Sequence, residues 1–545
     1  MGTNPLNYIR LGFLMMFFGC QDQQQVDLII HNAQIYTVNE QFGQAEAFAV
    51  REGKFVEVGN SAVILKKYAA DEVLDLQGAA VYPGFIDAHA HFYGYGTSLQ
   101  IADLTGAASF GETLERLLKH REKHPEQPWL LGRGWDQNLW EDKAFPHREK
   151  LDELFPELPV LLTRIDGHAA LANGKALELG GITASTSMLG GKVVLESNVP
   201  TGILIDNAIG LVSDKIPELG LDEKEKALLA AQDNCFQVGL TTVADAGLDR
   251  EIIELMEEMQ REGRLKMRIY AMVSPTPENK AHYFEKGPYQ NDWMTVRGFK
   301  IFGDGALGSR GAALLQPYHD APEEQGFLLS SVEEFEALAQ EMYEHGFQMN
   351  THCIGDSTNR TLLDIYAKVL EGANDRRWRI EHAQIVNRED VSKFETLSII
   401  PSVQPTHATS DMYWAEDRLG PDRIKDAYIF KALLDQNGYI ALGSDFPVES
   451  INPLYGFHAA VARQDAEGWP EEGFQSENKL TREEALKGMT IWAAYANFEE
   501  DRKGSIEAGK LADFVITEQD LMTTPDEELR DIVVKATYVG GEKVF

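Results

Sequence analysis

Residues 81 to 91 read Val81-Tyr-Pro-Gly-Phe-Ile-Asp-Ala-His-Ala-His91, and the apolar run within them predicts a β-strand that ends in two histidines. Side chains two residues apart on a strand point to the same face, so both imidazoles can reach one metal ion. Taken alone, such a pair is more often solvated or caps a core than binds metal. A metal site therefore requires further ligands from elsewhere in the chain.

Helix, turn and apolar strand follow one another three times between positions 331 and 445. The first unit opens with the capping box Ser331-x-x-Glu334 and its helix stops at Gly346. Alternating helices and apolar strands favour a parallel sheet, and metal-competent groups at strand ends favour a (β/α)₈ barrel. The three predicted strands end in His352, His382 and Asp445.

At these residues the chain resembles the metal-dependent amidohydrolase superfamily, and within it amidohydrolase family 3, which includes YtcJ-like and N-substituted formamide deformylase-like proteins. The motifs that carry the resemblance follow one another in family order over almost the whole chain. They are 83–91, Asp166-Gly-His-Ala-Ala170, 200–204, 300–310, His352 with 354–356, 379–384, 443–447 and 504–513.

The fold class that we expect is α/β, with a (β/α)₈ TIM barrel at residues 83–502. Short β-like runs occur at both ends of the chain, and the resemblance implies that 21–82 and 503–545 form one small β-sandwich domain beside the barrel. Residues 105–215 are long for a single connection. We expect them to form an inserted subdomain over the barrel mouth.

The resemblance also gives a hypothesis for the metal ligands, in which one or two divalent ions lie at the strand ends. Zinc suits a set of nitrogen and oxygen ligands, although iron and manganese fit the same residue types. One ion is expected on His89, His91 and Asp445, and a second on His352 and His382, with Lys300 bridging the two as a carbamate.

Lys300 lies in a strand-like stretch where its side chain is expected to face the barrel interior. A bare ammonium close to a dication is unfavourable, so such a lysine either loses its proton or is modified. The resemblance places it at the end of the fourth barrel strand, where many superfamily members carry a carboxylated lysine. The alternative is a lysine that is ion-paired to Asp304 or to another carboxylate, and a mononuclear metal centre is the fallback.

These ligands predict hydrolysis of a C–N bond other than a peptide bond, in a small N-acyl or N-formyl compound. Metal would activate a water molecule and polarise the carbonyl, and Asp445 would act as the catalytic proton carrier between water and leaving nitrogen. Two alternatives stay open, because fold does not fix reaction. They are hydrolysis of another bond or isomerisation on the same scaffold, and a non-catalytic binding lipoprotein.

Four residues outside the ligand set are candidates for substrate binding. Trp135 offers apolar contact area, and His168 can hydrogen-bond an acyl oxygen. Asp304 and Arg310 follow a barrel strand, where they would recognise substrate or order the loop by pairing. For Trp135 the alternative is packing inside the insertion, and for His168 it is capping a turn.

Composition excludes some classes of partner. The 545 residues include 50 basic and 86 acidic ones, a net charge of −36, which argues against nucleic acid and anionic membrane surfaces. A small-molecule substrate is the expected partner. The sequence does not predict the oligomeric state.

An apolar run at positions 11–18 ends at Gly19-Cys20 before a polar stretch, which predicts a lipoprotein-type signal peptide at residues 1–20. The run is too short to span a bilayer. The mature protein would then be anchored to a membrane only through a lipid on Cys20, in an extracytoplasmic compartment of a bacterium, the periplasm or the outer membrane. An ordinary signal peptide or a cytoplasmic protein with a misassigned start are the alternatives.

Overall fold

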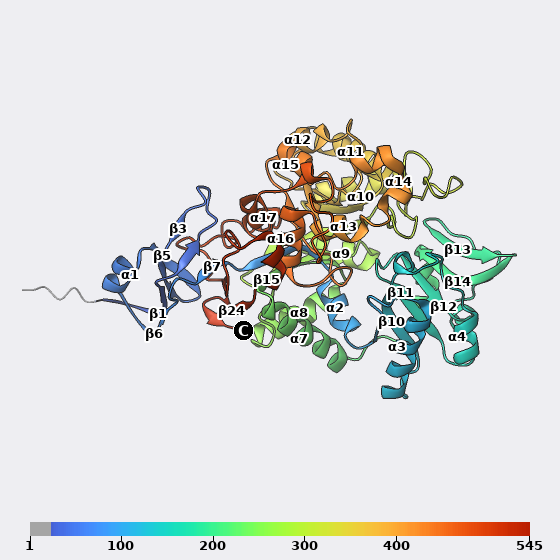
Figure 1. Cartoon of the computed structure of the whole chain (residues 1–545), viewed down its shortest axis with the longest axis horizontal. Coiled ribbons are helices and arrows are strands. Elements are labelled where there is room, and N and C mark those ends of the chain that lie inside the picture. The colour runs from blue at the N-terminus through green and yellow to red at the C-terminus, as the bar shows by residue number, and fades with distance from the viewer. Residues whose placement is uncertain (1–22) are drawn as a thin grey trace, which may run out of the picture.

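The structure is a computed structural model that describes residues 23–545 (Figure 1). Cys20 and the predicted signal peptide lie outside the described residues. Figure 1 shows three parts along the long axis: sheets near the amino terminus, a central barrel with its helices, and a further sheet on the opposite side. Within residues 23–545, no helix combines the length and apolar character needed to cross a bilayer.

The centre is a nearly closed barrel of eight parallel strands, which confirms the predicted fold class. Both faces of the strands are covered, so β16 is buried at every position, as expected for a parallel sheet under helices. The strands are β8 (Phe85–Ala90), β15 (Leu240–Leu248), β16 (Arg268–Val273), β18 (Met294–Phe302), β19 (Gln348–Cys353), β20 (Arg379–His382), β21 (Ile400–Val403) and β22 (Ala441–Leu442).

The first and last strands meet through the segment that follows β22. The His91 backbone N–H donates to the Phe446 carbonyl at 2.8 Å, and the Asp445 N–H donates to the His89 carbonyl at 2.8 Å. The Asp87 carboxylate accepts hydrogen bonds from the Ser444 N–H at 3.0 Å and from its hydroxyl at 2.6 Å. Closure of the barrel thus brings His89 and Asp445 together.

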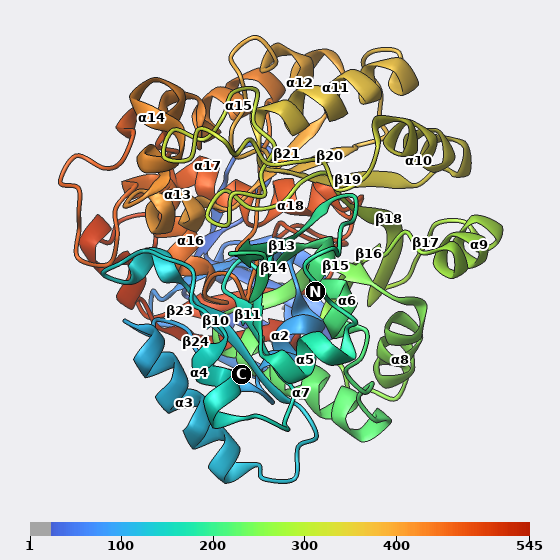
Figure 2. The ribbon, with the colours of Figure 1, turned by 90° about the vertical axis from the view of Figure 1, so that its right-hand side faces the viewer.

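Helices surround the barrel in a ring (Figure 2). The helix predicted after Ser331 is present, with both halves of the capping box formed and Gly346 in the left-handed conformation at its end. The helices of the ring are α7 (Leu221–Gln237), α8 (Arg250–Arg261), α9 (Pro277–Lys286), α10 (Val332–His345), α11 (Asp356–Leu370), α12 (Ser392–Thr396), α15 (Phe430–Asn437), α16 (Pro453–Ala462) and α17 (Arg482–Gly488). Inside the ring, α18 (Ile491–Ala496) packs against strands of the barrel. Near the mouth lie α2 (Phe92–Ser98), α13 (Pro405–Asp411) and α14 (Ala415–Arg423).

Two sheets at one end of the barrel share an apolar core and combine strands from both ends of the chain. Phe48 and Phe514 meet in this core with ring centroids 4.9 Å apart. One sheet has the order β5 (Lys54–Gly59), β4 (Ala47–Arg51), β1 (Gln24–His31), β6 (Tyr68–Asp75), with α1 (Ser61–Lys67) packed on it. The other has the order β25 (Glu542–Lys543), β24 (Val534–Val539), β23 (Phe514–Thr517), β7 (Ala80–Pro83), β2 (Gln34–Tyr36), β3 (Gln44–Ala45). We call these two sheets the sandwich.

A six-stranded sheet at the other end of the barrel interrupts the connection between β8 and β15 (Figure 1). Its strands have the order β13 (Gly191–Glu196), β14 (Val199–Asp206), β12 (Ala169–Ala172), β11 (Val160–Arg164), β10 (Leu130–Trp135) and β9 (Ala102–Asp103). The same stretch of chain contains α3 (Phe110–Lys123), α4 (Glu149–Leu154), α5 (Gly174–Leu179) and α6 (Asn207–Ser213). We call this sheet with its helices the inserted sheet.

Candidate metal centre

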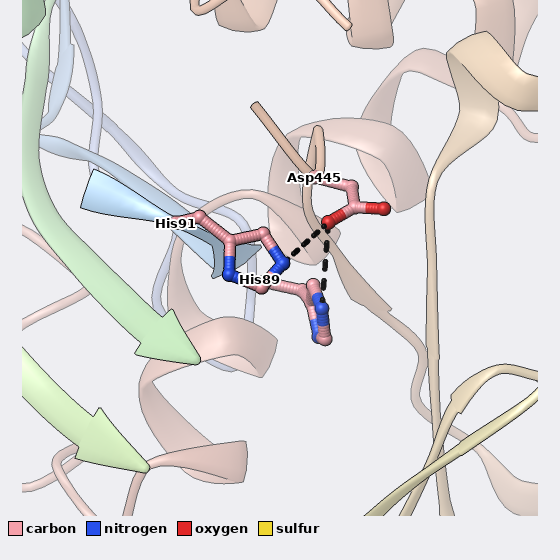
Figure 3. Close-up of side chains that lie close together, drawn as sticks. All are labelled: His89, His91 and Asp445. Carbon is pink, nitrogen blue, oxygen red and sulfur yellow. Dashed lines mark ion pairs between the residues drawn. The ribbon is translucent and has the colours of Figure 1, made fainter. Parts of the chain in front are cut away.

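Three predicted ligands meet where the barrel closes (Figure 3). His89 and His91 come from the end of β8 and Asp445 from the segment after β22, and one ligand atom of each lies within 4.8 Å of the others. The His91 Nε2 and His89 Nε2 atoms are 3.2 and 3.6 Å from Asp445 Oδ1. This buried oxygen has no hydrogen-bond partner among the described residues. Two imidazole nitrogens around an unsatisfied carboxylate oxygen fit a divalent metal ion.

Both imidazoles are oriented by a second partner. His89 Nδ1 donates to Glu381 Oε2 at 2.6 Å, and His91 Nδ1 donates to the Ala246 carbonyl at 2.9 Å. Burial alone would raise the pKa of Glu381, but the neighbouring His89 and Arg379 lower it, which keeps Glu381 ionised as the acceptor. With the proton held on Nδ1, each Nε2 carries the lone pair that a metal can bind, and that of His89 faces Lys300 Nζ in the structure.

His382 and His352 lie beside this cluster at the ends of β20 and β19. The His382 ring centroid is 4.9 Å from that of His89 and 4.5 Å from that of His352. His382 Nδ1 donates to Gln404 Oε1 at 2.7 Å, so its Nε2 is also free. Neither histidine belongs to the 4.8 Å group, and a second metal ion on them stays a prediction.

Lys300 is buried inside the barrel, with Nζ 2.9 Å from His89 Nε2. It forms no ion pair within the described part of the chain, and in particular none with Asp304. Burial lowers the pKa of Lys300 to about 8, against the opposite effect of Asp445 and Glu381. The amine thus lies beside the metal ligands without a counter-ion.

Two pockets of about 270 and 280 Å³ meet at the metal centre. His168, from the inserted sheet, lines both of them, and its ring centroid is 4.8 Å from that of His352. The His168 Nδ1 atom bonds Asp206 Oδ1 at 2.6 Å. Burial alone would lower the pKa of His168, but Asp206 raises it. His168 therefore faces the reacting region from the side opposite the barrel strands.

The charges that surround His168 are paired inside the inserted sheet. Arg164 is buried and forms ion pairs with Asp136 and Asp166. All three residues line the 270 Å³ pocket together with His168. This network fixes the wall of the pocket that faces the barrel.

The structure places Trp135 away from the pockets, which corrects the expectation that it contacts substrate. Its indole N–H donates to the Leu162 carbonyl at 2.7 Å, and its ring packs against Trp140 and Phe145 in the core of the inserted sheet. The neighbours Gly134 and Asp136 line the pocket instead. The pairing of β10 with β11 shifts in register between Arg133 and Trp135, which interrupts the regular alternation of side chains and turns Trp135 towards the core.

Asp304 and Arg310 are also placed outside both pockets. Asp304 is buried and accepts backbone hydrogen bonds from Ala313, Ile354 and Gly355 at 2.8 to 3.0 Å. Arg310 pairs with Asp320, with 2.8 Å between Nη2 and Oδ2. The two residues order the loop that follows β18, Arg310 through its ion pair and Asp304 through backbone hydrogen bonds, which agrees with the alternative of loop ordering.

Sequence reasoning missed four residues of the site. Three orient the histidines already described, and the fourth, His407, lines the 270 Å³ pocket with its Nε2 atom 3.9 Å from Asp445 Oδ2. Glu381 directly precedes the predicted ligand His382 in the sequence, and this position at a strand end is a signal that could have identified it. The four are Glu381, Gln404, Asp206 and His407.

Comparison with known proteins agrees with this geometry. A family model described as "Amidohydrolase family" matches residues 72–545. The chain is 34% identical to Protein LONG AFTER FAR-RED 3 of Arabidopsis thaliana, over 95% of this chain and 91% of that protein. It is 32% identical to YtcJ of Bacillus subtilis (95% and 99% covered) and 29% identical to N-substituted formamide deformylase of Arthrobacter pascens (95% and 98% covered).

A solved structure supports the same assignment. The crystal structure of an uncharacterized metal-dependent hydrolase from Pyrococcus horikoshii aligns with a TM-score of 0.75 and 28% identity, covering 92% of this chain and 99% of that one. Fold, site and relatives therefore agree, and the predicted family is confirmed. The chain belongs to the amidohydrolase family and is a metal-dependent hydrolase.

Proposed function

We propose that this hydrolase cleaves the amide-type C–N bond of a small N-formyl or N-acyl compound. The observation that carries the proposal is the convergence of His89, His91 and Asp445, each imidazole having its Nδ1 atom engaged by a second partner. A relative at 29% identity over 95% of the chain is named for the deformylation of N-substituted formamides. The pocket beside the ligands, about 270 Å³ and partly covered by the inserted sheet, suits a small molecule more than a polypeptide.

Zinc is the metal that we propose for this centre, because imidazole and carboxylate ligands suit it. Such an ion would activate water near neutral pH and polarise the substrate carbonyl. Asp445 lines both pockets, so its carboxylate can accept a proton on one side and return it to the leaving nitrogen on the other. His168, fixed by Asp206, would hydrogen-bond the acyl oxygen from the opposite wall.

The experiment measures formate or acid release from a panel of N-formyl and N-acyl amines, with both products identified. Chelation should abolish turnover and added zinc should restore it. His89→Ala and Asp445→Asn should each lose at least about a thousandfold in kcat/KM, roughly 4 kcal/mol. His147→Ala is the control, because His147 lies outside both pockets. Full turnover after verified metal removal would contradict the proposal, and an isomerised product would favour the isomerase alternative.

We also propose that Lys300 is carboxylated in the active protein. Its neutral amine would form an N–C bond with carbon dioxide and release a proton, which replaces a cation by an anion with two oxygens. Burial, the lowered pKa and the absence of an ion-pair partner within residues 23–545 support this reaction. The two oxygens would allow a second metal ion to bind near His352 and His382.

Metal content tests the carbamate. Wild type should bind two ions per chain and Lys300→Ala fewer, with recovery when a short carboxylic acid is added. A carbon-13 carbamate signal should appear in wild type supplied with labelled bicarbonate and be missing from the alanine variant. One ion per chain in fully active wild type, or a fully active alanine variant, would eliminate the bridging role.

Attachment of a lipid at Cys20, with an extracytoplasmic location, is a separate proposal that rests on the run 11–18 and Gly19-Cys20 alone. Labelling of cells with a radioactive fatty acid should mark wild type and not Cys20→Ala. Equal labelling of both, or of neither, would remove it.

A further inference from the structure

The 270 Å³ pocket extends from the metal centre towards α13 and the segment after Asp445. We call this region the acidic arm and define it by His407, Asp411, Trp414 and Glu449, all of which line the pocket. Two carboxylates and an indole are placed together here, away from the ligands on β8. None of the four belongs to the predicted ligand set or to the cluster of His89, His91 and Asp445.

The two carboxylates of the acidic arm are bonded only by neutral donors. Asp411 Oδ2 accepts from the Tyr428 hydroxyl at 2.8 Å and from Gln384 Nε2 at 3.3 Å. Glu449 Oε1 accepts from the Ser410 hydroxyl at 2.6 Å. Among residues 23–545, neither carboxylate forms an ion pair. The acids on the opposite wall differ, because Asp136 and Asp166 both form ion pairs with Arg164.

His407 supplies an independent sign that a ligand occupies this space. It is 8% exposed, and its Nε2 atom, 3.9 Å from Asp445 Oδ2, has no hydrogen-bond partner among the described residues. The ring lies parallel to that of His382, with centroids 5.9 Å apart and an interplanar angle of 18°, so the imidazole is held in place. A buried polar atom without a partner is unfavourable unless a bound molecule satisfies it.

The charge of the arm indicates what kind of ligand group fits. Burial raises the pKa of Asp411 to about 7 and raises the pKa of Glu449, and it outweighs the opposite effect of His407 on both and of Arg530 on Glu449. A cation in the arm would remove that penalty, whereas an anion would increase it. The Trp414 ring is a surface of the kind that attracts cations, and the Arg418 guanidinium already lies 5.6 Å from its centroid. The net charge of −36 also concentrates cations around the molecule.

We propose that the acidic arm binds a positively charged group of the substrate, so that the preferred substrates are small amides whose far end carries an ammonium or guanidinium group. That the substrate is an amide rests on the proposed function. The preference for a cation rests on Asp411, Glu449, Trp414 and His407. The second pocket is mixed in charge, because Arg133 and Lys300 line it together with Asp166 and Asp445. An anionic preference would point there instead.

Binding of three matched probes to the zinc-loaded protein tests the proposal without turnover. Pentylguanidine and pentylurea have nearly the same shape and differ in charge, and hexanoate is the anionic counterpart. Calorimetry should show pentylguanidine binding about tenfold more tightly than pentylurea, with hexanoate weakest. Pentylurea or hexanoate binding as tightly as pentylguanidine would overturn the proposal.

Variants locate the preference. Asp411→Asn and Glu449→Gln keep shape and remove charge, and each should reduce the guanidine-to-urea ratio by about threefold, with the double variant near a ratio of one. Glu416→Gln is the matched control, because Glu416 is exposed and outside the pocket but removes the same net charge. A double variant that is folded by circular dichroism and keeps the wild-type ratio would overturn the proposal. If the double variant does not fold, the guanidine-to-urea ratio of Glu449→Gln alone decides the question, and an unchanged ratio would overturn the proposal.

A kinetic comparison separates this inference from the proposed function. The substrates are N-formyl-5-guanidinopentylamine and N-formyl-5-ureidopentylamine, which should differ about tenfold in kcat/KM, mainly through KM. Selective binding of pentylguanidine without hydrolysis of either formamide would overturn the proposed function and leave the acidic arm supported. Hydrolysis of both formamides with equal kcat/KM would support the proposed function and overturn the role of the acidic arm.

Discussion

The sandwich and the inserted sheet lie at opposite ends of the same barrel, and they use buried charges differently. At the sandwich, Arg268 and Asp513 are both buried, and the carboxylate satisfies the guanidinium at 2.6 and 2.8 Å. At the inserted sheet, Arg164 and His168 are held by carboxylates but also line a pocket. No residue of the sandwich lines either pocket at the metal centre. The end at the strand amino termini serves stability, and the mouth serves chemistry.

The largest effect should come from breaking the pair at the sandwich. Asp513→Asn leaves the buried Arg268 without its counter-ion, which costs about 3–5 kcal/mol of unfolding free energy. Urea denaturation measures this loss, and hydrolysis at low temperature should stay within about twofold because the site is at the other end. Glu542→Gln is the control, since the exposed pair with Lys266 should contribute less than about 1 kcal/mol. A large loss of kcat in folded Asp513→Asn would break the distinction between the two ends.

Asp206→Asn tests the opposite end. The variant keeps the shape of the side chain but weakens the bond that orients His168, and kcat/KM should fall roughly tenfold to hundredfold. Unfolding free energy should change little by comparison. Asp214→Asn, an exposed site at the end of α6, should behave as wild type. If Asp206→Asn has normal kcat/KM but a lower unfolding free energy, the role of Asp206 is structural, like that of Asp513 at the sandwich.

Trp135→Phe should give the smallest effect and sharpens the comparison within the inserted sheet itself. Loss of the hydrogen bond to the Leu162 carbonyl should reduce the unfolding free energy by about 1 kcal/mol. Ratios of kcat/KM between substrates should stay at wild-type values, because Trp135 faces the core. A shift in substrate preference in Trp135→Phe would show that Trp135 contacts the substrate after all.

The barrel was predictable because its signals are local. The capping box at Ser331, the stop at Gly346 and the apolar run up to His352 are read within about twenty residues, and each is present in the structure. Parallel strands place their carboxyl ends at one edge, so the positions of His89 and Asp445 followed from the same pattern. These helix and strand signals can be read without knowing which residues far apart in the sequence are in contact.

The residues that the sequence did not predict depend on contacts between distant parts of the chain. His89 and Glu381 are 292 residues apart, and their contact depends on how the strands pair around the barrel. The register shift between Arg133 and Trp135 in β10 means that alternation in the sequence cannot tell which side faces the pocket. Asp304 looked like an ion-pair partner, yet it binds three backbone N–H groups that come from two other segments of the chain.

Closure of the barrel through Asp87 and Ser444 joins residues 357 positions apart, and the metal ligands His89 and Asp445 lie next to this join. During synthesis the first two ligands leave the ribosome long before the third, so the nascent chain cannot complete the centre. Contacts of such long range are late and slow to form. A metal that binds only the closed barrel favours the finished fold over every open intermediate. Uptake of the ion would then mark the last step of folding, and starvation for metal would leave the barrel free to reopen between its first and last strands.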